Sequence, residues 1–146
     1  MYEAIVVGTD GSETAAEAVS EAFSLAEALK SKVHVVSAYE PLRGARIVGA
    51  PEEAAKVWQI RPDSEVQSIV DEATSLARRR GVDVKAHTLV GDPADALLKV
   101  AEEENADVIV VGSRGMHGVG RVLGSVPNKV SHRAGCHVLI VATESG

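Results

Sequence analysis

The sequence contains a single cysteine, Cys136, and only 3% of its 146 residues are aromatic. One cysteine excludes an intrachain disulfide and a cysteine-based zinc site. Cys136 stands just before an apolar run, so we interpret it as a packed thiol rather than a reactive one. With so few aromatic residues, the core must consist mainly of Val, Ile, Leu and Ala, as is typical of parallel α/β sheets.

Long apolar runs are also absent. No run approaches the roughly 20 residues that a membrane-spanning helix needs, and no basic-then-apolar secretion signal opens the chain. We therefore expect a cytoplasmic protein with no membrane partner. The length of 146 residues predicts a single domain over residues 1–146.

Apolar, strand-like runs alternate with amphipathic, helix-like patterns along the whole chain. We expect strands at 4–7, 33–38, 82–90, 108–111 and 138–141, and helices at 13–30, 63–80, 93–104 and 127–134. This alternation predicts an α/β fold of three layers, with helices on both faces of a five-stranded parallel sheet in the order 3-2-1-4-5.

One segment of the chain carries little pattern. Residues 40–62 contain three prolines and mixed charges, so we expect an irregular connection with at most a helical turn at 52–58. The next helix is expected to begin at Asp63 or Ser64, because Ser64 and Gln67 have the spacing of a capping box.

Residues 107–128 hold the most informative pattern. The β-branched run at 108–111 predicts a buried strand, and Gly112, Gly115, Gly118, Gly120 and Gly124 follow it. Glycines let the backbone lie close against a ligand, and Pro127 predicts a helix start whose N–H groups point back into the loop. Strand, loop and helix N-terminus together predict an anion-binding cradle. The alternative is a long surface loop that binds nothing.

The charge distribution favours the cradle. The chain has a formal net charge of −6, yet no Asp or Glu occurs between Val108 and Thr143. The basic residues in that interval are Arg114, Arg121, Lys129 and Arg133. A locally basic loop on an acidic protein indicates a small anionic ligand such as phosphate rather than nucleic acid, which binds a wider basic face.

A short turn follows the first expected strand, in addition to the glycine-rich loop. Thr9, Asp10, Gly11 and Ser12 form it, and Ser12 can cap the helix that follows. Asp10 can hydrogen-bond a nucleotide, bind Mg²⁺ beside phosphates, or only stabilise the turn. In the order 3-2-1-4-5 this turn and the glycine loop leave the sheet at one edge, at the switch between the first and fourth strands.

Two histidines fall in the expected strands, His34 in 33–38 and His87 in 82–90. No second ligand stands at a metal-like spacing from His34, so we interpret it as structural. His87 belongs to an alternating pattern of apolar and polar residues, and we interpret it as a surface or half-buried residue.

Two patterns carry a resemblance to a known family. One is Gly112-x-x-Gly115, a spacer and Gly124-Ser125 after the expected strand, and the other is Val-Gly-Thr-Asp-Gly-Ser at 7–12. Together they resemble the universal stress protein family. The resemblance covers nearly the whole chain. In the nucleotide-binding members of that family the loop reads G-x2-G-x9-G-[S/T] and wraps the phosphates and ribose of ATP. The spacer at 116–123 is eight residues long here instead of nine.

The resemblance implies an adenine nucleotide alpha hydrolase-like fold and a site at defined positions. Gly8, Thr9, Asp10 and Ala38 would bound the adenosine, Val111 and Gly112 would line the ribose, and Gly115, Gly124, Ser125 and Val126 would donate to the phosphates. Charge alone adds Arg114 and Arg121 to this set. The resemblance also implies a homodimer through the C-terminal strand.

Our leading hypothesis is a stress-response regulatory protein that binds an adenine nucleotide, ATP or else AMP or cyclic AMP, with at most slow ATP hydrolysis. No general base is evident beyond Asp10 and His117. One alternative is a dimeric interaction module of the same fold that binds no nucleotide, favoured by the shortened spacer. Another is an enzyme acting on a phosphorylated metabolite.

Overall fold

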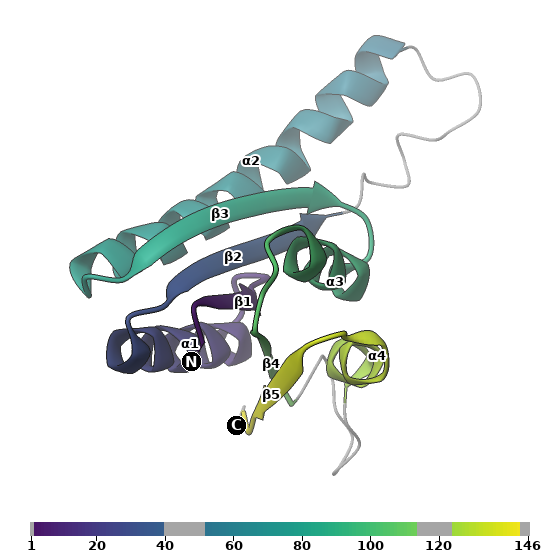
Figure 1. Ribbon diagram of the computed structural model, residues 1–146. Coiled ribbons are helices and arrows are strands. Elements are labelled where there is room, and N and C mark those ends of the chain that lie inside the picture. The colour runs from purple at the N-terminus through teal and green to yellow at the C-terminus, as the bar shows by residue number, and fades with distance from the viewer. Residues whose placement is uncertain (1, 40–51, 114–123, 144–146) are drawn as a thin grey trace.

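The computed structural model describes residues 2–39, 52–113 and 124–143. Strands and helices alternate along the chain, as expected (Figure 1). The strands are β1 (Ala4–Gly8), β2 (Lys32–Tyr39), β3 (Asp83–Val90), β4 (Val108–Gly112) and β5 (His137–Val141). The helices are α1 (Glu13–Leu29), α2 (Glu52–Arg79), α3 (Pro93–Glu103) and α4 (Ser125–Arg133).

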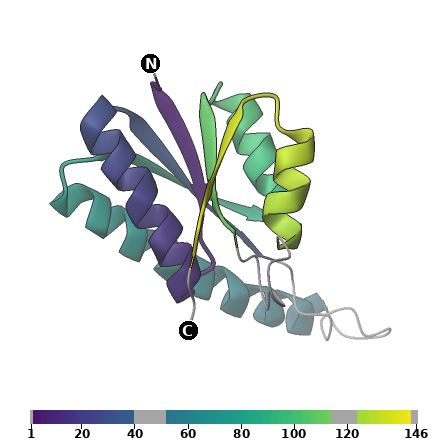
Figure 2. The same ribbon diagram turned by 90° about the horizontal axis from the view of Figure 1, so that it is seen from below.

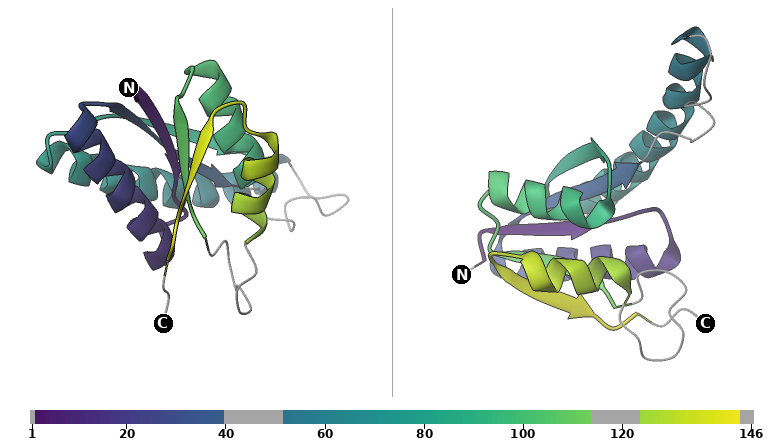
Figure 3. Two further views of the ribbon diagram at one scale, coloured as in Figure 1. Left: turned by 60° about the horizontal axis from the view of Figure 1, so that its bottom comes forward. Right: turned by 90° about the vertical axis from the view of Figure 1, so that its right-hand side faces the viewer.

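The five strands form one parallel sheet in the order β3-β2-β1-β4-β5, which confirms the predicted fold class. Helices α1 and α2 pack against one face, and α3 and α4 against the other, so the molecule has three layers (Figures 2 and 3). The carboxyl ends of all five strands therefore meet at one edge of the sheet.

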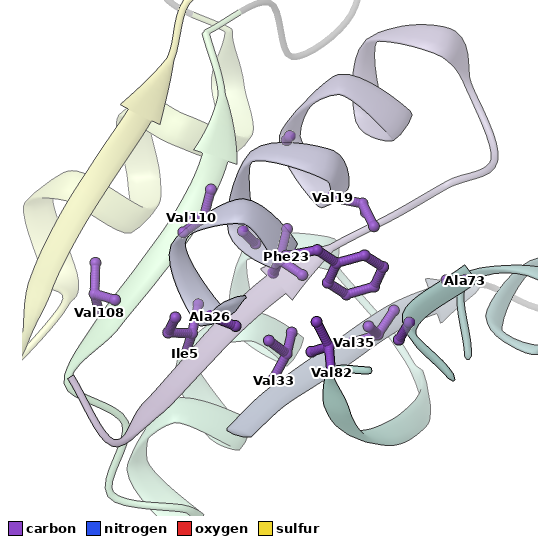
Figure 4. Close-up of a cluster of buried hydrophobic side chains, with 14 of the residues drawn as sticks. Ile5, Val19, Phe23, Ala26, Val33, Val35, Ala73, Val82, Val108 and Val110 are labelled. Atoms are coloured by element: carbon purple, nitrogen blue, oxygen red, sulfur yellow. The ribbon is translucent and has the colours of Figure 1, made fainter. Parts of the chain in front are cut away.

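Strand β1 shows how the sequence builds two cores. Successive side chains of a strand point to opposite faces of the sheet. Ile5 and Val7 accordingly pack with α1 and α2, whereas Val6 packs with α3 and α4. Phe23 of α1, fully buried, lies at the centre of the first core among valine and alanine side chains (Figure 4).

The two edge strands differ in character. β3 is an edge strand, as its sequence predicted, but the predicted alternation breaks at Lys85 and Ala86, which are both exposed. Val84 packs against the first core and Leu89 against the second, so neither face of β3 is wholly solvated. β5 is apolar throughout apart from His137, and Leu139 and Ile140 are 40% and 37% exposed. In the described sheet β5 has a neighbouring strand on one side only, so its outer edge presents apolar side chains beside backbone groups that no strand pairs, the situation that favours pairing with another chain.

Helix α2 differs from the sequence expectation. It begins at Glu52, inside the segment expected to be irregular, and continues through Pro62 to Arg79. A proline in a helix interior removes one hydrogen bond at a cost of about 3 kcal/mol, but the Glu, Ala, Lys and Gln residues around it favour a helix. The predicted start at Asp63 or Ser64, with its capping box, is therefore wrong. The N-terminal part of α2 extends beyond the sheet (Figure 1).

Helix α4 also begins earlier than expected. Its N-cap is Gly124 and its first residue is Ser125, so Pro127 occupies the third helical position rather than the first. Proline is tolerated there because the first N–H groups of a helix have no partner within the helix. Among the described helices, none has the length and apolar character needed to cross a membrane.

Candidate functional site

A pocket of about 340 Å³ opens at the carboxyl edge of the sheet, around the ends of β1 and β4. The strand order reverses between these two strands, which is where open α/β sheets bind ligands. Its volume lies at the lower end of the range that small-molecule sites occupy. Its walls are Gly8, Thr9, Asp10, Ser12, Thr14, Ala15, Ala18, Val36, Ala38, Asp92, Pro93, Leu97, Val111, Gly112, Ser125, Val126 and Pro127.

One part of the pocket is apolar. Val36 of β2, Leu97 of α3 and Val111 of β4 are buried and form its floor. Ala38, two residues beyond Val36 on the same face of β2, is only half-buried and keeps this part wide because its side chain is a single methyl group. A flat, apolar ring would fit such a surface.

Three helices begin at the pocket and point their N-termini toward it. Ser12 caps α1 by accepting from the Ala15 N–H at 3.2 Å, and Asp92 caps α3 by accepting from the Asp95 N–H at 3.0 Å. Gly124 has no side chain with which to cap α4. Within the described part of the chain no side chain caps this end of α4, and helix N-termini attract anions.

The Thr9–Ser12 turn holds Asp10 at the mouth of the pocket. The Thr9 N–H donates to the Val36 carbonyl at 2.9 Å, which fixes the end of β1 against β2. Asp10 Oδ1 accepts the Ser12 N–H at 2.9 Å, and Thr9 Oγ1 accepts the Gly11 N–H at 3.1 Å. Asp10 is exposed, so it both stabilises the turn and presents a carboxylate to the pocket.

Packing also limits the size of the residue at the ends of β1 and β4, where Gly8 and Gly112 stand. A Cβ at Gly8 would lie 3.1 Å from Leu97 Cδ2, and a Cβ at Gly112 would lie 3.1 Å from Thr143 Cγ2. Both distances are tighter than ordinary van der Waals contacts. A side chain at Gly8 would therefore displace Leu97 and with it the apolar floor of the pocket.

The described cations near the pocket are already paired. Lys129 Nζ lies 3.2 Å from Asp92 Oδ2 and 2.9 Å from Asp95 Oδ1, and Arg133 lies 3.9 Å from Asp95. Hydrogen bonds from the Asp95 N–H and from Lys129 lower the pKa of Asp92, and the two aspartates raise the pKa of Lys129. The sequence argument that Lys129 and Arg133 make this region basic therefore does not hold.

The structure brings most of the predicted site residues together. Eight of them line the pocket: Gly8, Thr9, Asp10, Ala38, Val111, Gly112, Ser125 and Val126. Gly124 stands beside it as the N-cap of α4. Arg114, Gly115 and Arg121, and also His117, lie outside the described residues.

Sequence reasoning missed the contribution of α3. Asp92, Pro93 and Leu97 line the pocket, although the sequence identified Asp92 and Pro93 only as a helix start. The signal was present, because the turn after β3 leaves the sheet at the same carboxyl edge as the two turns that were recognised.

The chain is similar to known proteins over almost its whole length. A family model described as the universal stress protein family matches residues 1–142. Universal stress protein Rv1636 of Mycobacterium tuberculosis H37Rv is 41% identical over 148 residues, covering 97% of each chain.

Two solved structures of similar proteins contain nucleotides. A universal stress protein in complex with cAMP is 35% identical, covers 98% of each chain and superposes with a TM-score of 0.74. The universal stress protein from Archaeoglobus fulgidus in complex with dAMP is 28% identical, covers 95% of this chain and 97% of its own, and superposes with a TM-score of 0.66.

Proposed function

Since the chain belongs to the universal stress protein family, we propose that it is a stress-response regulatory protein that binds an adenine nucleotide in the pocket between β1 and β4. The observation that carries the proposal is the composition of this pocket. An apolar floor and a polar rim of helix N-termini occur in one cavity of about 340 Å³. The two similar proteins solved with cAMP and dAMP support the same ligand class.

The shape of the pocket suggests how the nucleotide lies in it. The adenine would occupy the apolar part beside Ala38, with Val36 and Leu97 beneath it. The phosphates would reach the N-terminus of α4, where Ser125 and Val126 offer backbone N–H groups and Ser125 adds a hydroxyl. Arg114, Gly115 and Arg121 remain proposed phosphate contacts on sequence grounds.

A magnesium ion would have one direct ligand in the described part of the pocket. Mg²⁺ is usually bound by one or two carboxylates together with phosphate oxygens and water. Asp10 is exposed and fits this role, whereas Asp92 is already paired with Lys129. The residues therefore fit a magnesium ion that arrives with ATP rather than one held by the protein alone.

The chemistry of the pocket favours binding over turnover. Fast phosphoryl transfer requires a positioned nucleophile and concentrated charge stabilisation. The described walls offer the carboxylates of Asp10 and Asp92 but no Lys or Arg side chain. We therefore propose at most slow ATP hydrolysis and a role in sensing or signalling nucleotide levels in the cytoplasm.

A homodimer through β5 belongs to the same proposal. β5 is an edge strand with exposed Leu139 and Ile140, and a second copy would cover both its apolar side chains and its backbone groups. Measuring the molar mass by light scattering in dilute solution tests this part independently of nucleotide binding.

Calorimetric titration of the nucleotide-stripped protein tests the proposed ligand. ATP, AMP and cyclic AMP are titrated with and without Mg²⁺, and GTP serves as the control for base selectivity. We expect adenine-selective binding, and magnesium should tighten only the binding of ATP. Absence of binding by all adenine nucleotides would instead favour the interaction module that binds no nucleotide.

A further inference from the structure

A second cluster of polar side chains lies on the α3 face of the sheet, at the far end of α3 from the pocket. His34 Nδ1 of β2 and His87 Nε2 of β3 are 3.0 Å apart, and His87 Nε2 is 3.9 Å from Glu104 Oε2. One ligand atom from each of the three residues lies within 4.8 Å of the others. Glu104 is the C-cap of α3, whereas Asp92 and Leu97 face the nucleotide pocket from its N-terminal half.

The strand register explains why the two imidazoles meet. His87 pairs with Val36, two residues beyond His34, so His34 and His87 occupy diagonal positions on neighbouring parallel strands. Alternate residues of a strand share a face, which places both rings on the side covered by α3. The two histidines are 53 residues apart in sequence, so no local spacing could reveal them.

We propose that His34 Nδ1, His87 Nε2 and a Glu104 carboxylate oxygen form a binding site for a divalent transition-metal ion such as Zn²⁺. Two imidazoles and one carboxylate are a ligand set that zinc accepts, with a fourth position left for water. Ligands about 2.0 Å from a tetrahedral zinc ion lie about 3.3 Å from each other. The imidazole nitrogens are 3.0 Å apart and so require little movement.

The protonation of the cluster suits a cation. Metal-bound imidazoles must be neutral, and burial lowers the pKa of His34 and of His87, although Glu104 acts in the opposite direction. The hydrogen bond between the rings uses one ring proton, so the donating imidazole must adopt its other neutral tautomer, with the proton on its second nitrogen, before it can bind a metal. Both rings then bind as neutral imidazoles.

Lys85 is the main competitor for the site. Its ammonium lies 3.3 Å from Glu104 Oε2, and its side chain is 54% exposed. A lysine so exposed can swing into solvent and release the carboxylate at little cost. The positive charge of Lys32 also disfavours a cation in the cluster, whereas the negative charge of Glu103 favours one.

A metal ion at this position would join three elements. His34 and His87 would be fixed across the β2–β3 edge, and Glu104 would tie that edge to the end of α3. Because α3 begins at the nucleotide pocket, the ion would hold in place the helix that supplies Asp92 and Leu97 to the pocket. The proposal itself does not depend on nucleotide binding.

Titration of the metal-free, full-length protein with Zn²⁺ tests the site. Competition with a chromogenic chelator gives the affinity, and replacement by Co²⁺ gives a visible spectrum that reports the coordination number. We expect one ion per chain and the spectrum of a four-coordinate site with nitrogen and oxygen ligands. Failure of the protein to compete for Zn²⁺ would overturn the proposal.

Two variants locate the ion without disturbing the core. His87→Gln and Glu104→Gln change residues that are only partly buried, whereas His34 is almost fully buried. Each should weaken Zn²⁺ binding by at least the roughly 10- to 100-fold that loss of an outer-shell partner costs. The controls His132→Gln and Glu21→Gln alter exposed residues outside the cluster and should leave the affinity unchanged.

Lys85→Met separates this site from adventitious binding to surface histidines. Removing the ammonium that competes for Glu104 should tighten Zn²⁺ binding, whereas binding elsewhere would not respond. Equal affinity of the wild type, His87→Gln and Glu104→Gln, with the fold retained by circular dichroism, would overturn the proposal.

Discussion

The backbone N–H of Gly124 donates a hydrogen bond of 3.1 Å to the carbonyl oxygen of Ser113. These two residues flank the glycine-rich segment, so the end of β4 and the start of α4 lie side by side. The Ser113 N–H in turn donates to the Val141 carbonyl at 2.8 Å, and Ser113 Oγ accepts from the Thr143 N–H at 3.2 Å. The position of the α4 N-terminus beside the pocket is therefore set by β4 and by the C-terminal segment.

Ser125→Ala tests the contact between α4 and the phosphates. The change removes a hydroxyl at the pocket but keeps the helix and its backbone N–H groups. A hydrogen bond to a charged group contributes about 1.5–3 kcal/mol, so ATP affinity should fall roughly 10- to 100-fold by calorimetry. Ser131→Ala on the same helix removes a hydroxyl that bonds Asn128 at 2.9 Å and should not alter affinity. Unchanged binding in Ser125→Ala would remove Ser125 from the site.

Ala38→Leu tests the position of the base. The larger side chain would occupy the wide end of the apolar part of the pocket, and overpacking costs about 1–3 kcal/mol. We expect all adenine nucleotides to bind at least about tenfold more weakly, regardless of the number of phosphates. Ala86→Leu makes the same change at an exposed position of β3 and should bind normally. An effect confined to ATP would place the phosphates, not the base, beside Ala38.

Phe23→Ala tests the core between α1, α2 and the sheet. Phe23 is fully buried, and its ring is 5.8 Å from the guanidinium of Arg80. Truncation of a buried phenylalanine costs about 3–5 kcal/mol in the free energy of unfolding, measured by urea denaturation. Leu29→Ala, at a position 39% exposed near the end of the same helix, should cost less than about 1 kcal/mol. Equal losses in the two variants would contradict the assigned core.

Acid should weaken the fold through the buried His34 and the half-buried His87. Burial lowers the pKa of His34 and of His87 below the ordinary value of 6.5. As the pH falls below about 6.5, the unfolded chain takes up protons that the folded pair resists, so stability present above this pH is lost. The size of this loss of stability also depends on the charged groups around the two histidines, which are Lys32, Lys85, Glu103 and Glu104.

The measurement is urea unfolding in the presence of EDTA from pH 7.5 to pH 5. The wild type should lose stability over this range, and His87→Gln should lose less because it has one histidine fewer to protonate. A steeper loss in His87→Gln than in the wild type would show that the pair does not resist protonation.

The sequence predicted the fold through patterns that extend only a few residues. The apolar runs of β1 and β4 and the cap of α1 at Ser12 are local signals, and the structure confirms them. The start of α2 was wrong because the spacing of Ser64 and Gln67 was interpreted as a capping box after an irregular segment, whereas the residues around Pro62 continue the helix.

The sequence predicted the part of the candidate site that depends on the order of the strands in the sheet. The strand order predicted that the turns after β1 and β4 meet at one edge of the sheet, and Thr9, Asp10 and Ser125 of these turns line the pocket. The meeting of His34 with His87 depends on the register of two strands. The pairing of Lys129 with Asp92 depends on how α4 packs against α3. Neither contact can be predicted from the spacing of residues in the sequence.

Asp92→Asn tests how the pocket balances its charges. Asp92 lines the pocket and pairs with Lys129, so it places a negative charge near the proposed phosphates and also occupies a nearby cation. Asparagine caps a helix as well as aspartate does, so α3 should remain intact. The variant should bind ATP more tightly than the wild type does, and the gain should be smaller for AMP, which carries less charge.

The salt dependence shows whether the gain is electrostatic. Screening lengths fall from about 10 Å at 0.1 M salt to about 3 Å at 1 M, so the advantage of Asp92→Asn should shrink across this range. Asp71→Asn, at an exposed position of α2 that accepts a bond from Gln67, is the control and should bind as the wild type does. Weaker ATP binding by Asp92→Asn with an intact fold would mean that the carboxylate itself contacts the ligand, and Asp92 would then join Asp10 as a recognition residue.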